Sequence, residues 1–142
     1  MATGEVFLDT AFAIALTNKT DASHPEAAAL ARRIRAERIR MVTTLAVVFE
    51  IGNAFAKTRY RPAVIALVDS LRDGTDVELL DVTHARFQEA YDLFCARPDK
   101  NWSLTDCLSF VVMWERGIAD VLTTDRHFTQ AGFRPLLEQP KR

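Results

Sequence analysis

The chain has 142 residues, of which 49% are hydrophobic and 26% are charged. This composition is typical of a globular protein and excludes the disordered class. The 18 basic and 19 acidic residues give a formal net charge of −1, so any nucleic acid must be held by a local patch or by metal ions.

A chain of this length is expected to form one domain, residues 1–142, that buries roughly 68–70% of its unfolded surface. Asp9 interrupts the first apolar run, and no run approaches the about 18 apolar residues of a membrane span. We therefore expect a cytoplasmic protein without a membrane partner. Cys95 and Cys107 are interpreted as two reduced thiols in the core.

Strands and helices alternate along the first half of the chain. Strands are predicted at 5–9 and 40–44, and helices from Ala11 onward, at 24–39 and at 45–60. Pro25 stands at an acceptable first-turn position of the second helix.

The second half continues the same alternation. Helices are predicted at 62–71, 84–97 and 103–117, with strands at 77–82 and 120–124. A short helix and an edge strand at 133–137 follow. Gly74 marks a turn, Pro98 ends one helix and Gly117 ends another.

Apolar strands that alternate with helices indicate an α/β fold, with a small parallel sheet flanked by helices on both faces. In such open sheets the ligand crevice lies beyond the carboxyl ends of the strands. Asp9 and Asp125 follow two of the predicted strands at these ends. The sequence therefore predicts the functional site at this edge.

Each of these two acids also has an ordinary structural explanation. Asp9 is placed to cap the helix that begins at Ala11, and Asp125 to cap the short helix through Phe128. For Asp9 alone the two interpretations weigh about equally. Two such strand ends in one sheet favour the functional interpretation, because neighbouring strands bring the carboxylates together.

Asp106 lies three residues after Ser103 in "SLTD". This spacing is that of a capping box, and the helix dipole also favours a negative charge there. Capping is the better explanation of this motif taken alone. The functional alternative is that the first turn of the helix directs Asp106 into the crevice.

Glu50 is ambiguous by periodicity. It shares a stripe with Ala46, Asn53 and Lys57, opposite an apolar arc that includes Ile51. A stripe of this kind is usually a solvated face, and a solvated cleft would give the same pattern.

Four clustered acids would repel one another and take up protons unless a cation neutralised them. Carboxylate oxygens suit Mg²⁺ or Mn²⁺. Such ions can activate water and stabilise the leaving oxygen of a phosphodiester, and they would let a nearly neutral protein hold a polyanion.

The remaining polar residues give weaker signals. His24, His84 and His127 show no metal-ligand spacing and are interpreted as surface or packing residues. The arginine-rich segment 31–40 is most simply a solvated face, with contact to phosphates as the alternative.

The four acids and their surroundings resemble the PIN-domain family, specifically its VapC-like toxin ribonucleases. The matching segments are "FLDTAF", "DASHPEAAAL", "TTLAVVFEIGNAF", "SLTDCLSFVVM" and "VLTTDRHF". The resemblance runs over nearly the whole chain, and these segments in this order and spacing form a specific signal.

The resemblance implies a Mg²⁺-dependent endoribonuclease, with Mn²⁺ able to substitute, that cleaves single-stranded RNA by attack of an activated water. It implies that Asp9, Glu50, Asp106 and Asp125 hold the metal. Thr10, Asn53 and Ser103 would be supporting polar neighbours. A cognate antitoxin and a homodimer are implied as well, because many relatives have both.

The main alternative is a PIN-like module without catalysis, whose acids serve folding or partner contact. A phosphatase of the haloacid-dehalogenase type needs a second Asp two residues after the first, where this chain has Ala11. A receiver-type phosphoacceptor domain would distribute its strand-end acids differently. Metal binding separates the enzyme from the binding module.

Overall fold

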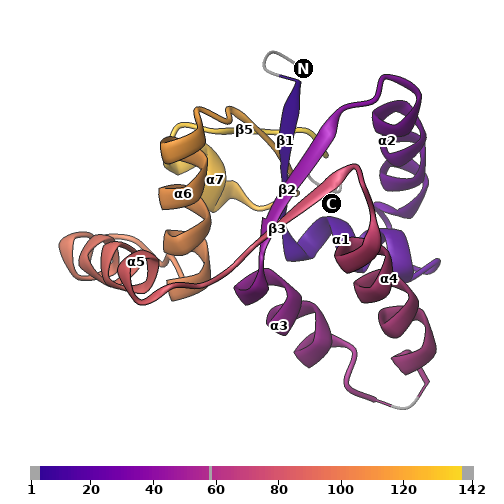
Figure 1. Cartoon of the computed structure of the whole chain (residues 1–142), viewed down its shortest axis with the longest axis horizontal. Helices are drawn as coiled ribbons and strands as arrows, with labels where there is room; N and C mark the ends of the chain where they lie inside the picture. The colour runs from indigo at the N-terminus through magenta and orange to yellow at the C-terminus, as the bar shows by residue number, and fades with distance from the viewer. Residues whose placement is uncertain (1–3, 58, 139–142) are drawn as a thin grey trace.

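The structure, a computed structural model, describes residues 4–57 and 59–138. Its strands are β1 (Glu5–Leu8), β2 (Arg40–Thr44), β3 (Val77–Leu80), β4 (Asp120–Leu122) and β5 (Arg134–Pro135). Its helices are α1 (Thr10–Thr17), α2 (His24–Ala36), α3 (Leu45–Ala54), α4 (Arg61–Asp73), α5 (His84–Ala96), α6 (Leu104–Arg116) and α7 (Arg126–Gln130). Figure 1 shows their arrangement.

The strands form one parallel sheet in the order β3-β2-β1-β4-β5. The two strands at its centre are almost entirely apolar. Val6 and Phe7 of β1 and Val121 and Leu122 of β4 are fully buried. The predicted parallel sheet is confirmed, and its burial on both faces explains why these strands read as continuous apolar runs.

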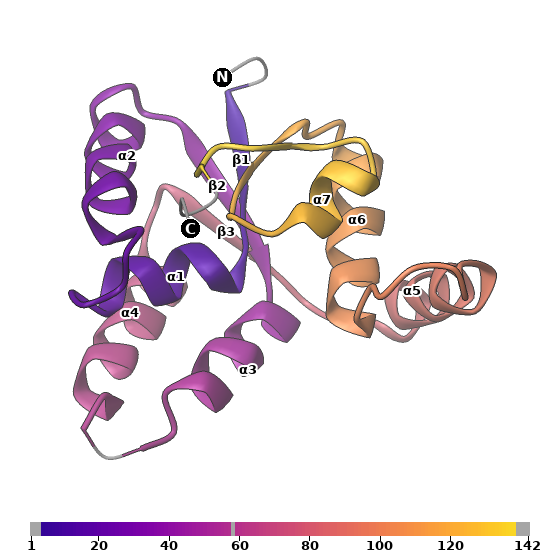
Figure 2. The same cartoon turned by 180° about the vertical axis from the view of Figure 1, so that it is seen from behind.

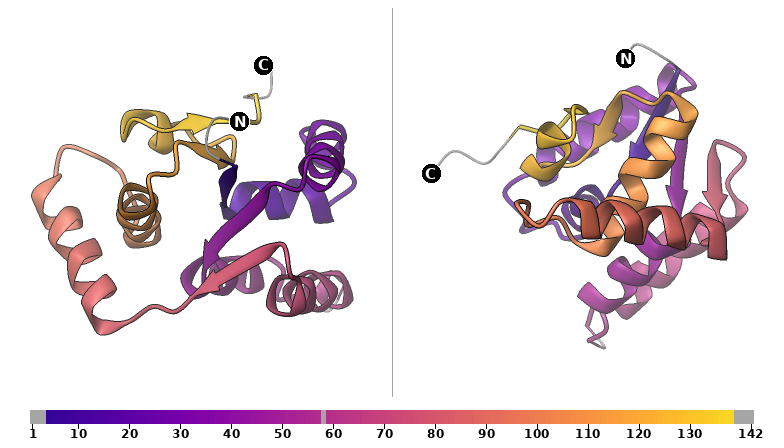
Figure 3. Two further views of the ribbon diagram at one scale, coloured as in Figure 1. Left: turned by 45° about the horizontal axis from the view of Figure 1, so that its top comes forward. Right: turned by 90° about the vertical axis from the view of Figure 1, so that its left-hand side faces the viewer.

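Helices cover both faces of the sheet. The helices α1, α2 and α4, in the part of the chain that leads from β1 to β3, lie on one face of the sheet. The helices α6 and α7, in the part that leads from β3 to β4 and β5, lie on the other face (Figures 1 and 2). Right-handed crossovers require this division once the direction of strand addition reverses. The predicted α/β/α architecture is confirmed, with α5 packed outside α6 (Figure 3).

A cluster of aromatic rings fixes α7 against α6. Phe110 of α6 lies 4.9 Å from Trp102 and 5.0 Å from Phe128 of α7, measured between ring centroids, in edge-to-face geometry. Phe133 lies 5.7 Å from the same ring. Such pairs add about 0.5–1.5 kcal/mol to the energy of area burial. The acids carried by α6 and by the start of α7 therefore belong to one rigid unit.

The helix predicted at 45–60 is wrong in its second half, because α3 ends at Ala54. Phe55 turns into the core and packs 5.3 Å from Tyr60, between ring centroids. The guanidinium of Arg61 donates to the carbonyl oxygen of Ala56 at 2.6 Å. These contacts turn the chain back into α4. The sequence marks none of them with a helix-breaking residue.

Other elements are shorter than predicted by a few residues. Helix α2 ends at Ala36 rather than 39, because Arg38 adopts a left-handed conformation with φ 54° that turns the chain into β2. Strands β1 and β4 end at Leu8 and Leu122, so that Asp9 and Thr123 lie just beyond the sheet. Among the described residues, no helix is both long and apolar enough to span a membrane.

Both cysteines are predicted to lie in the core, and this prediction is wrong for one of them. Cys107 is buried in α6, whereas Cys95 is exposed on α5. The outer position of α5 explains the difference, because this helix contacts α6 along one side and leaves most of its surface to solvent.

A network of ion pairs ties the amino edge of the sheet to α6. The guanidinium of Arg116 lies 2.9 Å from the Glu5 carboxylate and 2.8 Å from the Glu78 carboxylate. Arg40 approaches Glu78 at 3.5 Å. Because Arg116 is about three-quarters buried, with 27% of its side chain exposed, the network joins β1, β2 and β3 to the end of α6.

We expect Arg116→Ala to lower the free energy of unfolding by about 1–3 kcal/mol, because it removes the partly buried cation that the Glu5 and Glu78 carboxylates share. The matched control is Arg33→Ala, which removes an exposed pair with Glu37 and is expected to cost less than about 0.5 kcal/mol. Urea unfolding of both variants measures the difference. Equal losses would show that the network at the amino edge contributes no more than a surface ion pair.

Candidate active site

The site is built where β1 meets β4. These strands pair with Phe7 opposite Val121 and Leu8 opposite Leu122, at the point where the strand order reverses. Ligand crevices of open α/β sheets lie at this switch point. The next residues along the two strands are Asp9 and Thr123, so the structure places them side by side.

Asp9 is buried, with 5% of its surface exposed. It occupies the position before α1, but its side chain does not cap that helix. Instead its Oδ2 accepts a hydrogen bond of 2.7 Å from the Thr123 hydroxyl. Burial raises the pKa of Asp9 from 3.8 to about 7, and the charges of Asp106 and Glu50 act in the same direction.

Thr123 also connects Asp9 to Asp125. Its hydroxyl oxygen accepts a hydrogen bond from the Asp125 backbone N–H at 3.1 Å. The Asp125 Oδ1 in turn accepts from the His127 backbone N–H at 2.9 Å. Asp125 therefore caps α7, and this capping holds its carboxylate at the carboxyl edge of the sheet.

Asp106 has both of the roles considered from the sequence. It forms a capping box with Ser103, in which each side chain accepts from the other's backbone N–H at 3.0 Å. The Oδ2 atom of Asp106 also lies 3.0 Å from the His127 Nδ1. Burial is the largest influence and raises the pKa of Asp106, and the charge of Asp125 adds to the effect.

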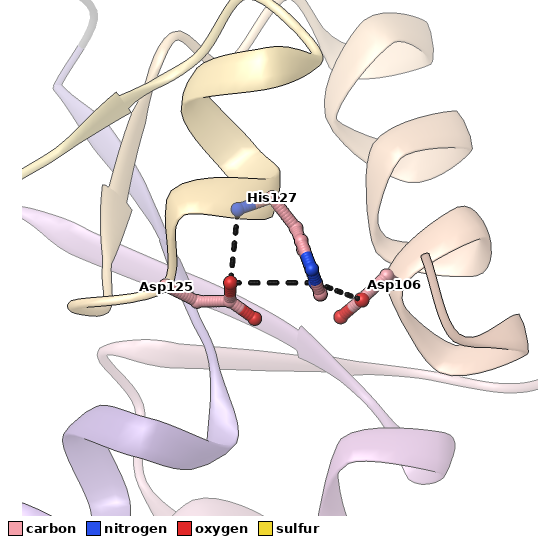
Figure 4. A group of neighbouring side chains, drawn as sticks. All are labelled: Asp106, Asp125 and His127. Carbon is pink, nitrogen blue, oxygen red and sulfur yellow. Dashed lines mark hydrogen bonds and ion pairs between the residues drawn. The ribbon is translucent and has the colours of Figure 1, made fainter. Parts of the chain in front are cut away.

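His127 lies between two of the acids (Figure 4). Its Nδ1 is 3.0 Å from Asp106 and 3.4 Å from Asp125. The three side chains offer ligand atoms that all lie within 4.8 Å of one another. The interpretation of His127 as a surface or packing residue is therefore wrong. A signal was present in its spacing, because His127 follows Asp125 within the first turn of the same short helix.

Glu50 joins the site through Thr10. The Thr10 hydroxyl donates a hydrogen bond of 2.7 Å to the Glu50 Oε1, and Thr10 follows Asp9 directly. Glu50 and Asn53 line a hollow of about 680 Å³ on this side, so the polar stripe of α3 borders a cleft. Within the described residues, Asn53 makes no hydrogen bond to any of the acids.

Hydrogen bonds thus link three acids in one series. Thr123 joins Asp9 to Asp125, and His127 joins Asp125 to Asp106. Burial is the main cause of the raised pKa values of Asp9 and Asp106, and the charges of neighbouring acids add to it. A divalent cation would supply the missing positive charge, and oxygen donors suit Mg²⁺ and Mn²⁺. The residues present therefore fit a metal centre.

The family model of the PIN domain matches residues 6–134, a range that includes all four acids. The chain belongs to the PIN-domain family. This PIN domain is 30% identical over 132 residues to the 23S rRNA-specific endonuclease VapC20 of Mycobacterium tuberculosis, in the CDC 1551 and H37Rv strains alike. The match covers 90% of this chain and 95% of the relative.

The fold is also similar to a solved structure along nearly its whole length. The crystal structure of Mycobacterium tuberculosis VapC20, described as a sarcin–ricin loop cleaving toxin, superimposes with a TM-score of 0.81 at 27% sequence identity. It covers 93% of this PIN domain and 98% of VapC20. The two chains therefore share the sheet and the helices that position the acids.

Without bound metal, we expect the free energy of unfolding of Asp9→Asn, relative to that of the wild type, to increase as the pH rises from about 4 to above 7. The folded protein holds a proton on Asp9 up to about pH 7, whereas the unfolded chain releases it near 3.8. Between these values the folded state binds more protons, so the contribution of Asp9 to stability falls with rising pH, by about 1.4 kcal/mol per pKa unit.

Urea unfolding in EDTA at pH 5 and pH 8 measures this difference. The control is Asp69→Asn on the exposed side of α4, which should leave the pH dependence unchanged. A constant offset between Asp9→Asn and wild type at both pH values would contradict a raised pKa at Asp9.

Proposed function

We propose that this PIN domain, residues 1–142, is a metal-dependent endoribonuclease that cleaves single-stranded RNA by attack of an activated water on a phosphodiester. The observation that carries the proposal is the convergence of Asp9, Glu50, Asp106 and Asp125 at the switch point of the sheet. The endonuclease activity named for VapC20 supports it. The sarcin–ricin loop of 23S rRNA is accordingly the first substrate to test.

The four carboxylates would hold Mg²⁺, with Mn²⁺ able to substitute. When bound, a divalent cation supplies Lewis acidity that lowers the pKa of a water and offsets charge on the phosphate oxygens. His127 lies within reach of the same ligand atoms.

The protein's own contribution is to hold the carboxylates in place. Thr123 fixes Asp9, and Thr10 fixes Glu50, through hydrogen bonds of 2.7 Å each. Ser103 fixes Asp106 through the capping box. These bonds restrict the side chains before substrate binds, which lowers the entropy lost in reaching a reactive geometry. Asn53 borders the hollow beside Glu50 and would face substrate there.

We propose further that the protein is the toxin of a type II toxin–antitoxin pair, that it acts in the cytoplasm where ribosomal RNA is found, and that it forms a homodimer. The resemblance to VapC20 supports the toxin assignment. Exposed aromatic side chains on α5 support a protein contact, namely Phe87, Tyr91 and Phe94. Sedimentation velocity measures the dimer, and co-purification with the product of a neighbouring gene tests the antitoxin.

Incubation of the wild-type protein with total RNA and Mn²⁺, followed by mapping of new 5′ ends, is expected to yield discrete cuts. Asp9→Asn should abolish them, since it removes a carboxylate of the proposed metal site, and the surface variant Asp69→Asn should retain them. Cuts that persist in Asp9→Asn or without metal would contradict the proposed enzyme. Metal binding without any cleavage would favour the non-catalytic binding module.

Asp106→Asn separates the catalytic role of this side chain from its capping role. The amide oxygen can still accept the bond from the Ser103 N–H, so we expect a loss of stability below about 1 kcal/mol. Cleavage should fall by at least about 100-fold, because a negatively charged oxygen is lost from the centre. Thermal unfolding and the rate of RNA cleavage give the two values. Full cleavage activity would exclude Asp106 from the site.

A further inference from the structure

A second hollow, of about 250 Å³, opens beside the acids on the side of α7. One wall is the loop 99–101, and the other is the start of α7 with the residue before it. Asp125 and His127 belong both to this hollow and to the acid cluster. Whatever enters the hollow therefore lies next to the reacting position of the proposed enzyme.

The cations in this hollow are Lys100 and Arg126. Neither forms an ion pair with any residue in the described part of the chain. The nearby Asp99 is paired instead with Arg97, through two hydrogen bonds of 2.9 Å. This pairing lowers the pKa of Asp99 to about 2, with a smaller effect from the charge of Lys100. Asp99 therefore forms its ion pair with Arg97 and not with Lys100 or Arg126.

The walls of the hollow are fixed before a ligand arrives. The buried Trp102 donates its indole N–H to the Oε1 of Gln130 at 3.0 Å, which leaves the amide nitrogen of Gln130 as a donor. Arg97 lies over the Trp102 ring, 5.1 Å from its centroid. Lys100 is half-buried. The hollow therefore presents cations and amide donors from an ordered frame.

The hollow on the α7 side carries the carboxylates of Asp99 and Asp125 beside its two cations, and the hollow on the Glu50 side differs in its charges. Its lining is apolar and acidic, with Phe49, Val82 and Asp81 beside Glu50, and the described residues that line it include no lysine or arginine. Without a bound cation, the acid cluster repels the phosphates of an RNA strand that crosses it. Local cations can offset this repulsion on the α7 side and not on the Glu50 side.

We propose that the hollow between the loop 99–101 and α7 is a phosphate subsite for the nucleotide adjacent to the cleaved bond. Lys100 and Arg126 bind that phosphate, and Asn101 and Gln130 donate to its oxygens or to the ribose. The inference rests on the proposed function, because it assumes that an RNA strand crosses the acids. It makes Lys100 and Arg126 binding residues that position the strand on one side of the cut.

Fluorescence anisotropy of the full chain tests the subsite. The background is Asp9→Asn, which prevents cleavage, and the probes are a labelled sarcin–ricin hairpin and an unrelated single-stranded 12-mer. We expect Lys100→Gln and Arg126→Gln each to weaken binding about tenfold at low salt. The loss should be similar for both RNAs, since a phosphate contact reads no sequence.

The salt dependence gives a second readout. Each lost phosphate contact should reduce the slope of log K against log salt by about 0.7. The matched control is Arg72→Gln, exposed near the end of α4, which should change neither affinity nor slope. Unchanged melting temperatures establish that the variants fold.

A series of RNAs with one methylphosphonate each locates the phosphate. In the Asp9→Asn protein, one neutral linkage next to the cleaved bond should weaken binding. In the protein that also carries Lys100→Gln and Arg126→Gln, the same linkage should reduce the affinity little further. Additive losses at that position, or affinities that match the Arg72→Gln control, would overturn the subsite. Those results would leave the proposed enzyme intact, because cleavage that survives Asp9→Asn is the outcome that contradicts the enzyme.

Discussion

The pairing of β1 with β4 is the contact on which the rest of the site depends. The paired residues of both strands are buried, and their register leaves Asp9 and Thr123 as the first residues beyond the sheet. The hydrogen bond between them begins a series that reaches Asp125, His127 and Asp106. A slip of one residue would move the side chains of β1 to the opposite face and separate the acids.

Two of the acids cap a helix with carboxylate oxygen atoms that also belong to the candidate site. Asp106 begins α6 through its capping box, and Asp125 caps α7. Because the two helices are held together by the rings of Phe110 and Phe128, each cap also sets the distance between the carboxylates. Capping and metal binding were competing interpretations in the sequence, and in the structure the capping bonds hold the carboxylates that the proposed metal site would use.

The sequence was sufficient for the features that depend on local pattern. Apolar strand runs predicted the parallel sheet, and the spacing from Ser103 to Asp106 predicted the capping box. It was insufficient where a contact joins distant elements. The end of α3 depends on Phe55 meeting Tyr60, and the placement of His127 depends on α7 packing against α6. Periodicity could not decide whether Glu50 faces solvent or a cleft, since a cleft is solvated too.

The aromatic cluster has a spectroscopic consequence. Both tryptophans of the chain belong to it: Trp102 is 5% exposed and Trp114 is 49% exposed. Trp102 directly precedes Ser103 and is bonded to α7 through Gln130. The intrinsic fluorescence of this protein therefore reports on the α6–α7 half of the molecule. The helices α1, α2 and α4 on the other face contain no tryptophan, so changes confined to them are silent in this signal.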